Sequence, residues 1–175
     1  MSTLTDRMIR AARLDVNLYE EVEADKNTMG QATTVVVLSS LAAGIGSFAE
    51  LGIVGIVVLT LGTLLGWYVW AYLTYFIGTR LLAEPQTKAD LGELLRTIGF
   101  SSSPGLIRVL GIIPGLNQYV SLVAGLWMLV AMIIAVRQAL DYSGTGRAVA
   151  VCVIGWVVQI TLLALLFAAL GGPPA

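Results

Sequence analysis

Histidine is absent from this 175-residue chain, and cysteine occurs once, at Cys152. Without imidazole, we do not expect serine-type triads, imidazole proton relays or most kinds of metal site. One cysteine cannot form an intrachain disulfide, and Cys152 lies in an apolar run, so we expect it to pack as a small apolar residue. The sequence therefore predicts no catalytic residue, no metal site and no cofactor.

Charge is also scarce. Charged residues make up 12% of the chain, and the two signs nearly cancel to a net charge of −1. Nucleic-acid binding is not expected, because it requires a clustered basic face. Hydrophobic residues reach 57% and the mean hydropathy is +0.86, values typical of a protein whose solvent is mostly lipid. The composition predicts an integral membrane protein.

Lysine and arginine are missing from residues 31–78 and from every position after Arg147. If the chain crosses a bilayer five times from a cytoplasmic N-terminus, all ten cations lie on the cytoplasmic side, as the positive-inside rule requires. With only four crossings, Arg137 and Arg147 would move outside. The charge pattern thus favours five crossings, with the C-terminus outside.

The membrane segments follow from the apolar runs, at residues 31–48, 51–78, 104–116, 119–136 and 148–170. The third run is the shortest, since its length as an α-helix is only about 20 Å and Pro114 interrupts it. It either crosses as a short kinked helix or re-enters the face from which it came. In the second run, Gly62 and Gly66 allow close helix approach, which we expect inside the bundle, the alternative being a dimer contact. The predicted fold is an all-α integral membrane protein, a bundle of five transmembrane helices forming a single domain over residues 1–175.

Two cytoplasmic segments, residues 1–28 and 79–103, carry amphipathic patterns. In the first, apolar residues recur about once per helical turn, which predicts one amphipathic helix. In the second, four apolar residues share one helix face and predict a short helix lying along the membrane surface: Leu91, Leu94, Leu95 and Ile98. Gly99 is expected to end that helix with a positive backbone dihedral angle.

Aromatic side chains gather near the end of the second span, where Trp67 and Trp70 lie on one helix face. Such rings anchor helices at the head-group layer, and the alternative is a groove for lipid or a partner. Phe100 is expected to wedge at the same level, facing the two tryptophans. Arg108 is expected to contact lipid phosphate or to snorkel to the cytoplasmic surface. The predicted lipid- or partner-binding residues are Trp67, Trp70, Gly99, Phe100, Pro104 and Arg108.

The junction at Gly99, Phe100, three serines and Pro104 resembles the glycine, aromatic, polar spacer and proline that precede the third membrane segment of the Yip family. These are the Ypt- and Rab-interacting membrane proteins and their short prokaryotic relatives. Residues 19–25 and the run from Trp127 to Tyr142 also resemble the prokaryotic members, and the likeness covers residues 14–170. The chain lacks the long acidic N-terminal region of eukaryotic members, which argues against binding a small GTPase.

No ionisable side chain lies near a predicted midplane, which disfavours an ion-coupled transporter. The cytoplasmic segments are too short to build a soluble active site, which disfavours an enzyme. The resemblance implies the same class, since Yip proteins are associated with membrane organisation and trafficking. We expect a non-enzymatic scaffold of the prokaryotic cytoplasmic membrane that binds lipids, other membrane proteins or further copies of itself at the cytoplasmic face. The alternatives are an accessory subunit of a larger membrane complex and a homo-oligomeric channel or small-molecule exporter.

Overall fold

The computed structural model describes residues 3–169, which form helices and no strand. The elements in chain order are α1 (Leu4–Ala12), α2 (Val16–Ala24), the 3-10 helix η1 (Lys26–Thr28), α3 (Met29–Gly46), α4 (Phe48–Phe76), the π-helix η2 (Ile77–Leu81), α5 (Leu91–Ser101), the 3-10 helix η3 (Ser103–Ile112), α6 (Asn117–Ala139) and α7 (Thr145–Ala169). The predicted outside location of the C-terminus concerns residues beyond those described.

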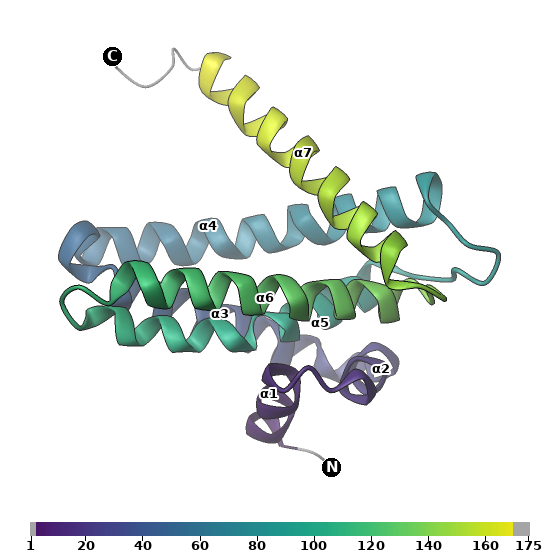
Figure 1. The fold of residues 1–175 in the computed structure, drawn as a ribbon, viewed down its shortest axis with the longest axis horizontal. Coiled ribbons are helices and arrows are strands. Elements are labelled where there is room, and N and C mark those ends of the chain that lie inside the picture. The colour runs from purple at the N-terminus through teal and green to yellow at the C-terminus, as the bar shows by residue number, and fades with distance from the viewer. Residues whose placement is uncertain (1–2, 170–175) are drawn as a thin grey trace.

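Figure 1 shows α3, α4 and α6 running in nearly the same direction, with α1 and α2 on one flank and α7 leaving at an angle on the other. α3 packs against α4, whereas α6 packs against α5 and η3. Four helices of the described chain are long and apolar enough to cross a membrane, within Lys26–Gly46, Gly52–Leu81, Asn117–Ala139 and Thr145–Leu162. The fifth predicted span is not among them, because its first residues form the ten-residue 3-10 helix η3. The count of five transmembrane helices therefore stays a prediction.

The end of α5 and η3 nevertheless run together along most of α3, in the same direction. Three glycines mark the contact, since a Cβ added to Gly99 would lie 2.9 Å from Ala32 Cβ, and one added to Gly105 would lie 3.4 Å from Ser39 Cβ. Farther along, a Cβ on Gly111 would lie 3.2 Å from the Cα of Gly46, at the end of α3. The chain thus travels beside α3 to its far end before α6 returns.

This path separates the bundle into two ends. We call the end formed by α1, α2, residues 82–90 and the turn 140–144 the charged end. Arg137 and Arg147 lie there with the N-terminal cations, since ion pairs and hydrogen bonds connect Arg147 to residues 82–84. Arg108 is different, because its backbone lies beside Gly46 at the opposite end. Arg108 therefore lies away from the charged end, and its contact with lipid phosphate or with the cytoplasmic surface stays a prediction.

The two amphipathic segments differ from their predictions. The first is broken into α1 and α2 at Leu14, whose φ is 62°, and Asp15 caps α2 by accepting a hydrogen bond from the Asn17 N–H. The second, α5, does not lie along a surface, because α2, α3, α4 and α6 all pack against it and eight of its eleven residues are buried. Gly99 does not end α5, which continues to Ser101. Its role is the close approach to Ala32.

The expectation for Gly62 and Gly66 is wrong. Both lie in α4, and no atom of the described structure lies within 4 Å of a Cβ added at either position. Glycines that do allow close approach inside the bundle include those between α3 and the segments α5 and η3.

A methyl group at Gly46 tests this contact. In Gly46→Ala the new Cβ would collide with the backbone oxygen of Arg108, so we expect a loss of about 1 to 3 kcal/mol in unfolding free energy. Thermal or denaturant unfolding in mild detergent measures it. The matched control is Gly62→Ala, where a Cβ meets open space and stability should be unchanged or higher. Equal stability of the two variants would contradict the close α3–η3 contact.

Candidate functional site at the charged end

The helices α1, α2 and η1, which we call the cap, are joined by an ionic cluster. Arg7 is 7% exposed, and its guanidinium pairs with Glu21 at 2.8 Å and with Asp25 at 3.3 Å. It also donates to Gln31 Oε1 in α3 at 2.9 Å. Arg10 pairs with Glu21 at 2.6 Å. Arginine suits this place because its planar fork donates to several carboxylates at once.

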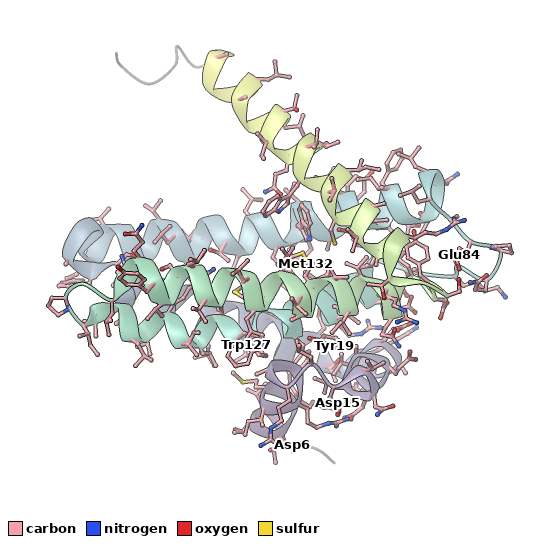
Figure 2. All side chains as sticks on the ribbon, in the orientation of Figure 1. Asp6, Asp15, Tyr19, Glu84, Trp127 and Met132 are labelled. Carbon is pink, nitrogen blue, oxygen red and sulfur yellow. The ribbon has the colours of Figure 1, made fainter. Side chains whose placement is uncertain are left out.

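Separate hydrogen bonds join the cap to the bundle. Arg96 of α5 donates from Nε to the Val22 carbonyl at 2.9 Å and from a second nitrogen to the Glu23 carbonyl. Trp127 of α6 donates from Nε1 to the Ala12 carbonyl at 2.8 Å. Figure 2 shows Trp127 and Tyr19 at the boundary between cap and bundle, with Asp6 and Asp15 farther out. Since these donors satisfy carbonyls at or next to the ends of α1 and α2, they fix the position of the cap.

Glu23 of α2 carries a carboxylate oxygen, Oε2, that is buried without a hydrogen-bond donor among the described residues. Burial, together with the negative charges of Glu20, Glu93 and Asp141, raises the pKa of Glu23 to about 8, although Arg96 opposes the shift. The cap is therefore docked most favourably when Glu23 is protonated.

A second contact, which we call the latch, connects residues 82–90 to the start of α7. Glu84 accepts hydrogen bonds from the Ser143 N–H at 3.0 Å and from Ser143 Oγ at 3.2 Å, and it pairs with Arg147 at 3.1 Å. The hydrogen bond from the Ser143 N–H is the largest of the effects that hold the pKa of Glu84 below its usual value. Tyr142 donates its hydroxyl to the Gly78 carbonyl at 3.0 Å. The latch fixes the point from which α7 leaves the bundle.

Between cap and latch lies a polar cavity of about 490 Å³, lined by Glu20, Gln86, Arg137, Gln138, Asp141 and Tyr142. Gln138 donates to Glu20 at 2.5 Å, and Arg137 donates to the carbonyls of Tyr142 and Ser143. Within residues 3–169, no group of three or more acidic, cysteine or histidine side chains could hold a metal ion. The polar groups at this end are thus arranged to join helices.

The cap also presents an outer surface. Ile9 is 48% exposed and Val16 is 43% exposed, and Arg13 lies between them in the chain, also exposed. No ion pair joins Arg13 to any residue that the structure describes. Exposed aliphatic side chains and a cation with no ion pair among the described residues, close together in the sequence, are suited to an anionic lipid surface or to a partner with acidic and apolar groups.

The six residues predicted to bind lipid or a partner do not form one surface. Phe100 is fully buried, and Gly99 and Pro104 are also buried. Trp67 is buried and donates its Nε1 proton to the Leu95 carbonyl at 3.1 Å. Phe100 therefore belongs to the core, whereas Trp70 faces α7.

Sequence reasoning missed the residues that dock the cap, Arg7, Arg96 and Trp127. Arg96 lies outside the apolar face predicted for residues 79–103, and nothing in the local pattern shows that α2 covers this side of the helix. One signal was available for the break between α1 and α2, because Asp15 followed by a short apolar pattern is a typical helix N-cap.

Comparison with known proteins gives one match. The family model described as the Yip1 domain matches residues 21–166 of the chain. No curated protein and no solved structure matches it. The matched range begins within α2, so it includes Val22 and Glu23, whose carbonyls accept the hydrogen bonds from Arg96 of α5.

The pKa of Glu23 predicts a pH dependence. Its folded value of about 8 lies above its ordinary value of 4.5, so the docked state should lose stability as pH rises between these values and change little above them. The chain has no histidine to titrate in this range, and the pKa values of Asp15, Asp25 and Glu84 are lowered and fall below it. Glu23→Gln should remove the slope and add at least about 1 kcal/mol at pH 8.5.

Thermal unfolding in detergent at pH 5.5, 7 and 8.5 measures this effect. The exposed Asp6→Asn is the matched control and should keep the wild-type slope. A wild-type midpoint that does not fall between pH 5.5 and 8.5, or a Glu23→Gln variant that follows the wild type, would show that Glu23 is not held neutral by the docked cap.

Proposed function

Since the chain belongs to the Yip1 family, whose model matches residues 21–166, we propose that this membrane protein is a non-enzymatic scaffold acting through its charged end. In this proposal the charged end faces the cytoplasm and binds lipids or other membrane proteins. The protein lies in the cytoplasmic membrane of a prokaryotic cell. The N-terminal cap supplies the binding surface, and the helices supply the anchor.

The observation that carries the proposal is the contrast between the two faces of the cap. Its inner face is fixed by the ion pairs of Arg7 and by the hydrogen bonds of Arg96 and Trp127. The same helices leave Ile9 and Val16 about half exposed, with the exposed Arg13 between them in the chain. A rigid support under an exposed apolar and basic surface suits docking, because little conformational entropy is lost on binding.

The orientation and the fifth crossing are part of the same proposal. The path of η3 beside α3 supports a crossing by residues 91–112 as a whole, although η3 is short as a helix. The backbone of such a segment must be satisfied by protein when it lies at membrane depth, and η3 packs against both α3 and α6. With this crossing, Arg137 and Arg147 lie at the charged end with the N-terminal cations. The positive-inside rule then favours a cytoplasmic charged end, with Arg108 at the opposite end as the exception.

Ile9→Ser combined with Val16→Ser tests the binding surface. Each aliphatic side chain contributes roughly 1.5 to 3 kcal/mol when buried against a partner or lipid, so the double variant should retain at least about tenfold less of its co-purifying proteins or anionic lipids. Mass spectrometry after gentle extraction measures retention. Thr5→Ala combined with Asn17→Ala, two exposed polar changes in the same helices, should retain the wild-type complement.

An unchanged complement in the Ile9 and Val16 variant would contradict the proposal. A stable association with a dissimilar membrane subunit that survives this variant would favour the accessory-subunit alternative. Ion or solute flux in proteoliposomes containing the pure protein would favour the channel or exporter.

A further inference from the structure

Arg108 lies at the end of the bundle opposite the cap and the latch. Its backbone oxygen adjoins Gly46, the last residue of α3. Lys26–Gly46 is a candidate membrane span of 21 residues, and a helix of that length covers about 30 Å. This is the thickness of the hydrocarbon core. Gly46 and the backbone of Arg108 therefore lie near the edge of the leaflet opposite the charged end.

The guanidinium of Arg108 has no hydrogen bond or ion pair with any residue that the structure describes. The side chain is partly buried, and its Nε is enclosed without an acceptor. The two terminal nitrogens, Nη1 and Nη2, are not enclosed in this way and reach the surface. Arg7 and Arg96 are more deeply buried but have carboxylate or carbonyl acceptors. A cation at the membrane is costly unless an anion meets it, so the anion for Arg108 must come from outside the described helices.

The geometry of the guanidinium selects the anion. Because Nε is enclosed, the edge formed by Nη1 and Nη2 faces outward, and these paired donors match two oxygens of a phosphate. The surface beside Arg108 is apolar, since Val109, Leu110 and Ile112 are 39%, 50% and 59% exposed. Such side chains meet acyl chains in a membrane protein. A phosphate attached to acyl chains satisfies both requirements, whereas a free phosphate ion satisfies only the first.

We propose that Nη1 and Nη2 of Arg108 bind the phosphate group of a glycerophospholipid in the leaflet opposite the charged end. The phosphate supplies the negative charge that the described helices do not, and the acyl chains lie along the exposed side chains of η3. Because the carbonyl of Arg108 adjoins Gly46, the bound lipid also holds the end of η3 against α3. The site lies at the other end of the bundle from the cap, so it does not rest on the scaffold proposal.

Photo-crosslinking beside Arg108 tests the proposal. The whole chain carries p-benzoylphenylalanine in place of Val109, in vesicles with equal amounts of phosphatidylglycerol and a glycosyl diacylglycerol that has the same acyl chains but no phosphate. Mass spectrometry counts the two adducts. With Arg108 the phosphatidylglycerol adduct should exceed the other about tenfold, the lower end of what hydrogen bonds to a charged group contribute. Arg108→Gln should give both adducts equally. Arg108→Lys keeps the charge but not the paired donors, and it should show a smaller preference than the wild type.

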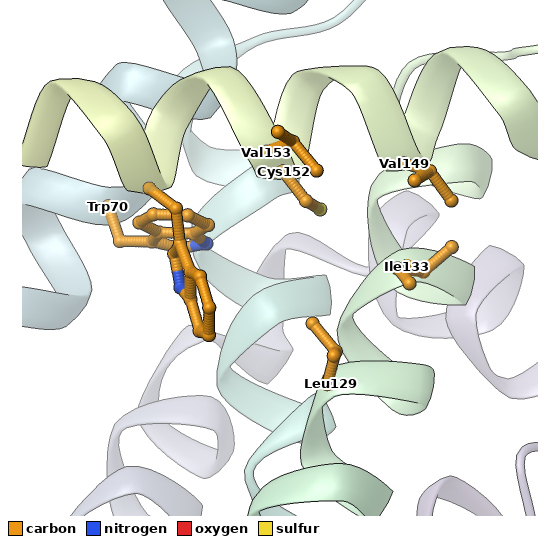
Figure 3. A pocket seen from close by; sticks show the side chains of 7 residues that line it. Trp70, Leu129, Ile133, Val149, Cys152 and Val153 are labelled. Carbon is orange, nitrogen blue, oxygen red and sulfur yellow. The ribbon is translucent and has the colours of Figure 1, made fainter.

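The control probe takes the place of Val153 in α7. Val153 is 54% exposed and borders a cavity of about 120 Å³ whose lining includes Trp70, Leu129 and Ile133 and no charged side chain. Figure 3 shows Val153 beside Cys152 on the α7 side of this cavity. A probe here should give the two adducts in the same ratio with Arg108 and with Arg108→Gln, and an unchanged yield shows that the variant is folded.

The proposal is overturned if the Val109 probe captures both lipids equally in the wild type, if Arg108→Gln keeps the preference or changes the ratio at Val153, or if Arg108→Lys matches the wild type. It is also overturned if excess inorganic phosphate abolishes the preference, because the site would then take the free ion. Glu50 is the only acidic residue between Asp25 and Glu84, and Glu50→Gln should leave the preference unchanged. A rise in that variant would show that a carboxylate of the chain itself occupies the guanidinium, and the proposal would be wrong.

Discussion

The close approach of α5 and η3 to α3 is the constraint on which the rest of the structure depends. Glycines at 99, 105 and 111 allow the two segments to run together from the charged end to the far end of α3. Because the chain reaches that end before α6 begins, α6 returns to the charged end with Arg137, and α7 starts there with Arg147. A different path for these residues would place both cations at the other end.

Because the charged side chains of the cap and the latch lie at one end of the bundle, two separate sets of polar contacts form there. The cap is held by Arg7, Arg96 and Trp127, and the latch by Glu84 with Ser143 and Arg147. The cap lies on one flank of the bundle, and α7, which the latch holds, lies on the other. The contacts of the cap fix an exposed surface on α1 and α2, and those of the latch fix the departure of α7, which opens the cavity beside Trp70. The exposed surface of the cap thus depends on polar contacts outside the apolar helices.

The sequence predicted the helical class, the membrane location and four long apolar helices, because hydropathy and helix length are local properties of the chain. It did not predict the burial of α5. The pattern of Leu91, Leu94 and Leu95 shows one apolar face, whereas the opposite face is covered by α2 through Arg96, a contact between residues more than 70 positions apart. Phe100 was placed at a surface for the same reason. Arg108 was found by its residue type, but its place at the far end depends on the path of η3 beside α3.

Disulfide formation between Ser39→Cys and Gly105→Cys, in a Cys152→Ser background, tests most directly whether η3 lies inside the bundle beside α3. The Cβ atoms would lie 3.4 Å apart, close to the distance that a disulfide requires. We predict rapid and nearly complete oxidation in the membrane, with little or none for Ser39→Cys paired with Gly111→Cys, since Gly111 lies beside Gly46. If Ser39 and Gly105 fail to cross-link, or if both pairs cross-link equally, residues 103–112 do not follow α3 and the account is wrong.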